Sequence, residues 1–170
     1  MSFSEHRVIP PLPQQLAGRS TTFLPPPIDG SFSVQQMYDW HLQHSPNHPI
    51  FVYAREDRSL RNICWAEAVT AAYTCARLMN TRMPFKEKPP VVAMLSMSDA
   101  ITYTPTIMGL QRANYIVFPI SPRSSAPAVA RLLHEVGVQH VLVGKDASMQ
   151  DLSHEALDIL RSQHPSTDLP

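Results

Sequence analysis

Three histidines lie close together in the segment WHLQHSPNH, at positions 41, 44 and 48. Imidazole is a common zinc ligand, and the i, i+3 spacing of His41 and His44 places two rings side by side on a helix. Pro46 separates His48 from the other two, and Asp39 is the one nearby side chain that could complete a ligand set. The alternative is a helix end that carries ordinary surface histidines, and we favour it over a zinc site.

A glycine followed by a lysine, as in Gly144-Lys145, is a feature of phosphate-binding loops. Such a loop also needs a glycine five positions before Gly144, where this chain has Gln139, and Ser or Thr after the lysine, where it has Asp146. The charge of Asp146 would repel a phosphate. We therefore interpret the dipeptide as a left-handed surface turn. The five glycines are also too far apart for a Gly-x-Gly-x-x-Gly motif.

Arg123 follows the apolar segment Tyr115 to Ile120, which has the character of a buried strand. Pro119 and Pro122 fix the direction in which the chain leaves this strand. In a parallel sheet, the carboxyl ends of the strands form the edge where α/β proteins bind ligands. Two interpretations stay open: Arg123 contacts a ligand there, or it pairs locally on a stiff connector.

The other reactive side chains have structural interpretations. Glu56 and Asp57 fall in a predicted tight turn where carboxylates face solvent, and Asp99 lies at a helix start, where its charge suits the helix dipole. On one helix Cys64 and Cys75 would be about 16 Å apart, too far for a disulfide, so we expect two buried thiols. The sequence contains no Gly-x-Ser-x-Gly nucleophile motif.

The elements that must position these residues follow from apolar periodicity. We predict a helix that Ser33 caps and Pro46 stops, strands 49–54 and 60–64 joined as a hairpin, a helix over 65–80, and then strands 91–95, 115–120 and 140–143 alternating with helices 98–112, 125–136 and 152–162. Strands that alternate with helices are typical of a parallel sheet.

Several helix positions carry specific expectations. The predicted buried positions are Val34, Met37, Tyr38 and His41 in the first helix, Val69, Ala72, Tyr73, Ala76 and Met79 in the second, and Val129, Leu132, Leu133 and Val136 in the helix that Ser125 caps and Gly137 ends. Pro105 conflicts with a regular helix over 98–112. Either the helix is kinked there, or it begins later with Pro105 in its first turn.

Composition excludes several classes of protein. With 14 Lys+Arg against 14 Asp+Glu the chain has no net charge, which disfavours general nucleic-acid binding. No apolar run approaches 18 residues, and the first residues lack the apolar core of a signal peptide. An apolar fraction of 44% excludes bulk disorder. We expect a cytoplasmic protein without nucleic-acid or membrane partners.

Four segments together carry a family resemblance. The stretch GLQRANYIVFPISPRSS resembles the second core motif of adenylate-forming (AMP-binding) enzymes, which precedes their phosphate loop. PIFVYAREDRSLRNICWAEAV, with Trp65 and Glu67 after a hairpin, is similar to their first-strand and "tWaEl" region, and residues 130–144 followed by MQDLSHEAL continue the match. The likeness covers most of residues 29–160 and is strongest to the adenylation domain of fungal carboxylic acid reductases that are similar to nonribosomal peptide synthetases. Asn114 stands where the motif has glycine, and Pro105 where relatives have an ordinary helix.

The resemblance implies a chemistry that this sequence does not itself contain. The family uses ATP and Mg²⁺ to convert a carboxylate to an acyl-adenylate, transfers the acyl group to a phosphopantetheine carrier, and in its reductase types reduces the thioester with NADPH. The phosphate loop, the nucleotide-contacting segments, the magnesium-binding acid and the lid lysine belong downstream of residue 170. The resemblance therefore assigns no catalytic, cofactor-binding or metal-binding residue here, and we expect none of these cofactors to bind to the fragment.

These observations predict an α/β fold, a parallel sheet flanked by helices with an N-terminal helix and hairpin, as an incomplete N-terminal lobe of an adenylate-forming domain. Residues 1–30 are expected as a Pro-rich extended arm, 31–162 as a partial AMP-binding domain and 163–170 as a flexible tail. The functional hypothesis is an N-terminal fragment, inactive alone, whose partner is the downstream lobe. The alternative is a non-catalytic interaction module that docks on a full-length relative through its open sheet edge. We also expect an uncovered strand and an uncovered face of helix 125–136, with marginal solubility.

Overall fold

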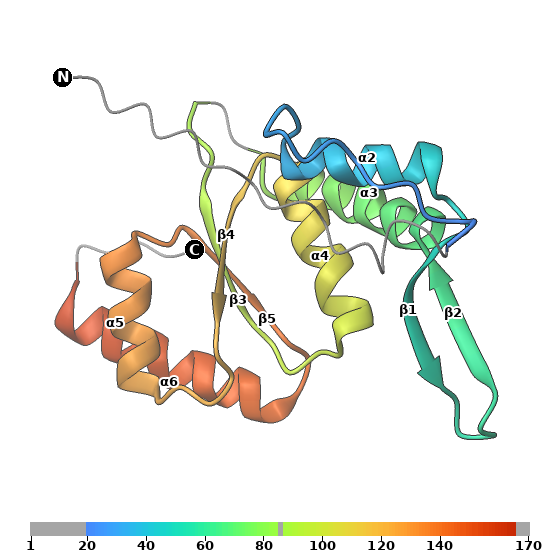
Figure 1. Cartoon of the computed structure of the whole chain (residues 1–170). Coiled ribbons are helices and arrows are strands. Elements are labelled where there is room, and N and C mark those ends of the chain that lie inside the picture. Colours follow the sequence, from blue (N-terminus) through green and yellow to red (C-terminus); the bar gives the residue numbers. More distant parts are fainter. Residues whose placement is uncertain (1–19, 85–86, 166–170) are drawn as a thin grey trace, which may run out of the picture.

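A computed structural model describes residues 20–84 and 87–165 of the chain (Figure 1). The elements are α2 (Val34–His44), β1 (Pro49–Ala54), β2 (Leu60–Cys64), α3 (Trp65–Arg82), β3 (Val91–Leu95), α4 (Ala100–Arg112), β4 (Ile116–Ile120), α5 (Ala126–Val136), β5 (His140–Val143) and α6 (Ala147–Gln163). They occur in the predicted order, although α6 begins before the predicted Leu152. Residues 1–19 and 166–170, which hold most of the predicted arm and tail, lie outside the described residues.

Three parallel strands form the central sheet, in the order β4-β3-β5. Ala93 of β3 lies opposite Phe118 of β4 on one side and Val141 of β5 on the other. The α/β fold with a parallel sheet flanked by helices is therefore confirmed. β3 is the central strand of this sheet, and its run VVAML is apolar throughout because helices cover both of its faces.

Each face of the sheet has its own core. Ala93 and Leu95 point to the face that α5 and α6 cover, where they pack with Leu133 and Leu160. Val92 and Met94 point to the opposite face and pack with residues of α3 and α4, including Leu110. Figure 1 shows the two helix pairs on opposite sides of the sheet. Val129, Ala130 and Leu133 are buried on the inner face of α5, whereas Val136 keeps 38% of its surface accessible, so α5 is covered on one face and leaves apolar surface near its end.

Several local predictions are confirmed by the backbone. Ser33 caps α2 in a capping box with Gln36, and Gly137 ends α5 in the left-handed conformation with φ 66°. Asn114 also has a positive φ, 65°, so asparagine makes the turn for which the motif uses glycine. Ser125 occupies the N-cap position of α5, but its side chain makes no capping hydrogen bond.

Pro105 lies inside α4 rather than in its first turn. The helix begins at Ala100 because Asp99 caps it, accepting a hydrogen bond of 2.8 Å from the backbone N–H of Thr102. The alternative in which the helix begins later is therefore wrong. Because proline has no backbone N–H, α4 is one hydrogen bond short at this position, and Pro105 is buried.

Three residues predicted to be buried are exposed instead. Val34, Tyr73 and Val136 keep 47%, 38% and 38% of their surface accessible. Tyr73 turns toward a polar contact with Asp39, which periodicity does not reveal. The two cysteines are only partly buried, so the prediction of two buried thiols is wrong. Cys64 is the last residue of β2, in agreement with the predicted strand 60–64.

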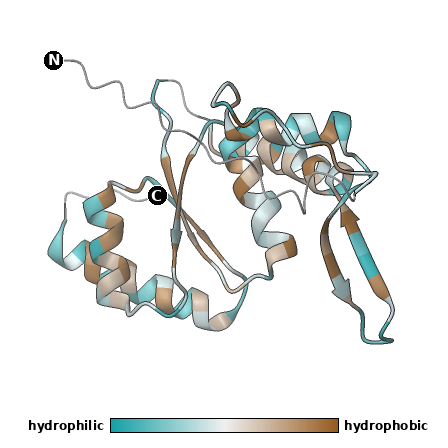
Figure 2. Ribbon diagram, viewed as in Figure 1, coloured by the Kyte–Doolittle hydropathy of each residue, from teal (hydrophilic) through white to brown (hydrophobic). Residues whose placement is uncertain are grey.

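The β1–β2 hairpin stands apart from the central sheet (Figure 1). Its strands are antiparallel, with Val52 opposite Asn62 and Ala54 opposite Leu60. Figure 2 shows hydrophobic residues along both strands, and Val52 and Leu60 are 57% and 72% exposed. A two-stranded hairpin is marginally stable by itself, so its connection to α3 supports it.

Candidate functional site

The carboxyl edge of the sheet is where the chain changes direction between its two helical layers. After β3 the chain enters α4, which packs on one face, whereas after β4 and β5 it enters α5 and α6 on the other face. Neighbouring strands whose helices go to opposite faces leave a crevice between their loops, and α/β proteins bind ligands at such points.

Two adjoining hollows occupy this crevice. One has a volume of about 230 Å³ and is lined by Met94, Ser96, Ser98, Tyr103, Thr106, Leu142, Val143, Gly144 and Lys145. The other, of about 400 Å³, shares Ser96, Ser98 and Tyr103 and extends to Ala100 and the segment Pro119, Ile120, Ser121 and Pro122. The exit segment of β4 and the Gly144-Lys145 turn therefore lie on either side of the loop that follows β3.

Hydroxyl groups dominate the polar lining. The Oγ atoms of Ser96 and Ser98 hydrogen-bond to each other at 2.6 Å, and the Ser98 N–H donates to Ser96 Oγ at 3.1 Å. Burial raises the pKa of the Tyr103 phenol, which therefore stays protonated and able to donate a hydrogen bond at neutral pH. The hydroxyl groups at this edge can therefore donate and accept hydrogen bonds, and Lys145 adds a positive charge.

The Gly144-Lys145 turn does not fit the phosphates of a nucleotide. The N–H of Gly144 donates to the carbonyl oxygen of Leu95 at 2.8 Å, so it cannot donate to a phosphate. A Cβ built at Gly144 would lie 3.0 Å from Ser96 Oγ and 3.3 Å from a carboxylate oxygen of Asp146. That carboxylate therefore lies beside the turn, where its charge would repel an anion. Gly144 also lacks a positive φ, so the predicted left-handed turn is wrong.

The structure separates the two basic residues that sequence analysis placed at this edge. Lys145 lines the smaller hollow, but Arg123 is exposed and lines neither one. The backbone N–H of Arg123 donates to Ser121 Oγ at 3.3 Å, which fits the stiff-connector interpretation. Sequence analysis missed Ser96 and Ser98, although two hydroxyls directly after a buried strand are a signal that it could have used.

The three histidines do not converge on a metal. His44 stacks on Trp40 at 3.8 Å, and His48 lies 4.9 Å from the ring of Phe23. His41 is buried between Phe23 and Trp65, as helix periodicity predicted, so the expectation of surface histidines is wrong for His41, whereas His44 is exposed as expected. Within residues 20–84 and 87–165, no group of three or more His, Cys, Asp or Glu side chains could hold a metal ion.

The acidic turn behaves as predicted. Asp57 accepts a hydrogen bond of 2.9 Å from the Ser59 N–H, and hydrogen bonds from Ser59 lower the pKa of this exposed carboxyl. Glu56 lines the same shallow surface as Asp57 at the hairpin tip. Both carboxylates are therefore exposed residues of the hairpin turn.

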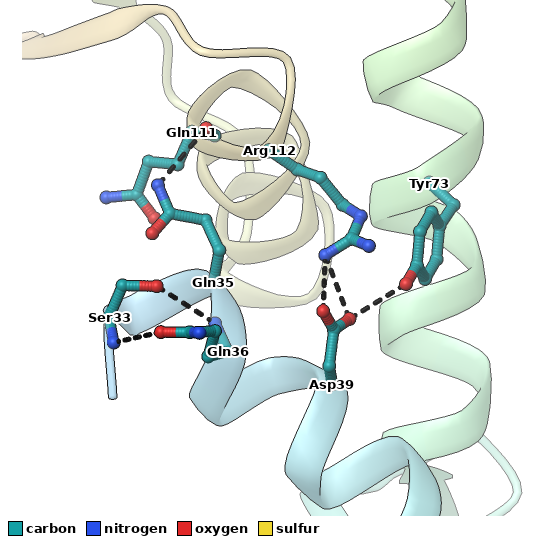
Figure 3. A network of polar contacts seen from close by, with 7 residues as sticks. All are labelled: Ser33, Gln35, Gln36, Asp39, Tyr73, Gln111 and Arg112. Carbon is teal, nitrogen blue, oxygen red and sulfur yellow. Dashed lines mark hydrogen bonds and ion pairs between the residues drawn. The ribbon is translucent and has the colours of Figure 1, made fainter. Parts of the chain in front are cut away.

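A polar network joins three helices that lie far apart in sequence (Figure 3). Asp39 of α2 accepts two hydrogen bonds from Arg112 of α4, at 2.8 and 2.9 Å, and a third from the hydroxyl of Tyr73 of α3 at 2.8 Å. Gln35 donates to the backbone carbonyl of Gln111 at 3.2 Å. The network fastens α2 to the helices that cover the sheet, and sequence analysis did not predict it.

In the part of the chain that the structure describes, no helix has the length and apolar character needed to cross a membrane. A scan against models of known protein families finds no match.

The fold matches that of solved adenylate-forming proteins. The N-terminal domain of FACL13 from Mycobacterium tuberculosis superposes with a TM-score of 0.60 at 21% identity, over 82% of this chain and 32% of that one. An artificially fused adenylation–PCP di-domain, NpsA-ThdA from Klebsiella oxytoca, superposes with a TM-score of 0.58 at 14% identity, over 69% of this chain and 20% of that one. The fold is therefore that of the N-terminal subdomain of an adenylate-forming protein.

Sequence comparison narrows this class. The chain is 37% identical to adenylate-forming reductase Nps10 of Heterobasidion annosum over an alignment of 170 residues, which covers 95% of this chain and 15% of the relative. It is 32% identical to adenylate-forming reductase Nps11 of Serpula lacrymans over 140 residues, 81% of this chain and 12% of that relative. The chain is thus similar to the N-terminal portion of fungal adenylate-forming reductases, which confirms the resemblance predicted from sequence, and spans about one seventh of their length.

Proposed function

We propose that this chain supplies the first lobe of a domain that activates a carboxylic acid with ATP, forming an acyl-adenylate in a reductase-type enzyme. The observation that carries the proposal is the 37% identity to an adenylate-forming reductase across 95% of the chain. The confirmed order of elements, with a parallel sheet and an adjacent hairpin, supports it because it agrees with the fold of adenylation domains.

The role of this lobe is to build a scaffold rather than to carry out the chemistry. Ser96, Ser98 and Tyr103 offer hydrogen bonds at the carboxyl edge, but the environment of Gly144 does not suit a phosphate. In the complete domain the ATP, Mg²⁺ and carrier contacts would come from other residues. The chain alone is therefore proposed to be inactive.

ATP–pyrophosphate exchange with the 170-residue chain and a mixture of aliphatic and aromatic carboxylic acids tests the inactivity. We expect no exchange above a reaction without protein. Robust exchange by this chain would overturn the scaffold role, because catalytic groups would then have to lie among residues that we assign to packing.

A second candidate is a non-catalytic interaction module that docks on a full-length relative. The observation in its favour is that β4 and β5 are both edge strands of the described sheet, and Ile116 of β4 is 52% exposed. Light scattering of the chain mixed with the adenylation domain of a related reductase separates the two candidates. A stable one-to-one complex favours docking, and a monomer that ignores the added domain excludes it.

A further inference from the structure

A short segment before α2 is fastened to the joint between α2 and α3 by aromatic rings and histidines. We call residues 22–24 the clasp. The ring of Phe23 lies 5.2 Å from His41 and 4.9 Å from His48. The N–H of Leu24 donates to Ser45 Oγ at 2.8 Å, and the indole N–H of Trp40 donates to the Leu24 carbonyl at 3.3 Å.

His48 makes the outermost contact of the clasp. Its Nδ1 lies 3.0 Å from the Oγ1 of Thr22, and its backbone carbonyl accepts a hydrogen bond from the N–H of Trp65 at the start of α3. The clasp therefore contacts the loop that follows α2, and this loop is hydrogen-bonded to the start of α3.

His41 is the central group of this joint. Its ring is sandwiched between Phe23 at 5.2 Å and Trp65 at 4.2 Å, with interplanar angles of 22° and 14°. The residue is only 6% exposed, and its Nδ1 is buried without a hydrogen-bond partner among the described residues. An imidazolium carries N–H donors on both ring nitrogens, so protonation would leave a buried charged donor without an acceptor.

The charged groups around His41 do not offset this cost. His48 faces it from the loop after α2, and a charge there would repel a second one. On α2 itself, Asp39 is bound by Arg112, and on α3 Glu67 is bound by Arg61. The C-terminal end of α2 favours a cation. The pKa of His41 nevertheless lies below 6.5, because of burial first and the nearby His48 second.

We propose that His41 makes the attachment of the clasp dependent on pH, so that the clasp is closed while this imidazole is neutral and opens when it is protonated. In the closed state the ring binds fewer protons than in the open state. The clasp is therefore fully stable above the ordinary histidine pKa of 6.5 and weakens as the pH falls below it. Opening releases residues 22–24 and uncovers the rings of His41 and Trp65 to solvent. This inference does not depend on the proposed function.

Hydrogen exchange of the Leu24 amide measures clasp opening in the full chain, because that N–H bonds across the clasp to Ser45. After correction for the intrinsic exchange rate, we expect its protection to fall by up to about tenfold per pH unit below pH 6.5. The amide of Val69 in the buried face of α3 is the internal reference and should stay more protected than that of Leu24 at every pH.

Two variants make the test specific. His41→Phe keeps an aromatic ring in the stack but cannot be protonated, so the pH dependence at Leu24 should largely disappear. His154→Gln removes an exposed histidine of α6 and should behave like the unmodified chain. The same pH dependence in His41→Phe as in the unmodified chain would overturn the proposal, and so would protection at Leu24 that does not change with pH.

A measurement without any variant covers the case in which His41→Phe does not fold. The proton NMR shifts of the His41 ring report its titration in the unmodified chain. We expect a midpoint below 6.5, with the protection at Leu24 falling from pH 6.5 down to this midpoint. A midpoint at or above 6.5 would overturn the proposal, because a protonated ring would then be compatible with the closed clasp.

Discussion

The guanidinium of Arg112 lies 3.9 Å above the centroid of the Tyr73 ring, and both side chains bind the same carboxylate, that of Asp39. Figure 3 shows the three residues meeting from α4, α3 and α2. Arg112 and Asp39 are 28% and 30% exposed, so their ion pair is better shielded from water than those on the outer helix surfaces. This arrangement ties the first described helix to the layer that covers the sheet.

Asp39→Ala should lower the free energy of unfolding by about 1–3 kcal/mol, because it removes hydrogen bonds to a charged partner that stays half-buried. Urea denaturation followed by circular dichroism measures the change. The matched control is Glu135→Ala, which removes an exposed i, i+4 pair with Arg131 and should cost less than about 0.5 kcal/mol. Equal losses in the two variants would contradict the structural role of the network.

Gly109→Ala should prevent normal packing of α4 against α3. A Cβ at this position would lie 2.5 Å from Cys75 Cβ and 2.7 Å from the Ala72 carbonyl oxygen, so the two helices would have to separate. We expect a loss of about 3 kcal/mol of stability, the upper end of the usual range for overpacking.

Gly137→Ala is the control for Gly109→Ala. Nothing lies within 4 Å of a Cβ built at Gly137, but the backbone there has a φ of 66°, which is strained for alanine. The substitution should therefore lower the stability by only about 1 kcal/mol. Thermal unfolding ranks the two variants, and a smaller effect at Gly109 than at Gly137 would disprove the close helix contact.

The free energy of unfolding should decrease as the pH falls below 6.5. His41 has a lowered pKa in the folded chain, so the unfolded chain binds more protons in this range and acid favours unfolding. The carboxyls of Asp57 and Glu67 also have lowered pKa values, but their contribution is lost only below about pH 4.5. Denaturation at pH 7.5 and 5.5 should show a difference that shrinks in His41→Phe. An unchanged difference in that variant would assign the effect to another group.

Both cysteines should react with iodoacetamide more slowly at pH 7 than a free thiol does. Burial raises the pKa of Cys75, and burial followed by Glu67 raises that of Cys64, so less thiolate is present. Glu67→Gln should accelerate the labelling of Cys64, whereas Glu56→Gln, at the exposed hairpin turn, should leave it unchanged. Mass spectrometry of the labelled peptides measures both rates, and no response to Glu67→Gln would contradict the assigned cause.

Local patterns predicted the fold well because they depend on neighbours in sequence. The continuous apolar run Val91–Leu95 indicated a strand covered on both faces, and Gly137 indicated the end of α5 through its left-handed backbone. Contacts between distant residues left no such signal. Asp39 and Arg112 are 73 positions apart, and periodicity placed Tyr73 in the core although it reaches toward Asp39 instead.

The candidate site was predicted only in its location. Parallel strands bring their carboxyl ends together, so the sequence indicated the edge of the sheet at which the two hollows lie. The identities of its polar groups were missed: Ser96 and Ser98 line the hollows, whereas Arg123 lines neither of them. The burial of His41 was predicted from helix periodicity, but its stacking on Phe23 and Trp65 requires three separate segments to fold together.

The central claim is that this chain is the first lobe of a carboxylate-adenylating domain. The most direct test replaces the matching 170-residue segment of the Heterobasidion annosum reductase with this chain and measures ATP–pyrophosphate exchange. The same reductase with that segment deleted, and a chimera carrying Gly109→Ala, are the controls. We predict exchange by the chimera and none by either control. A chimera that folds cooperatively yet shows no exchange with any acid that the parent reductase accepts would contradict the account.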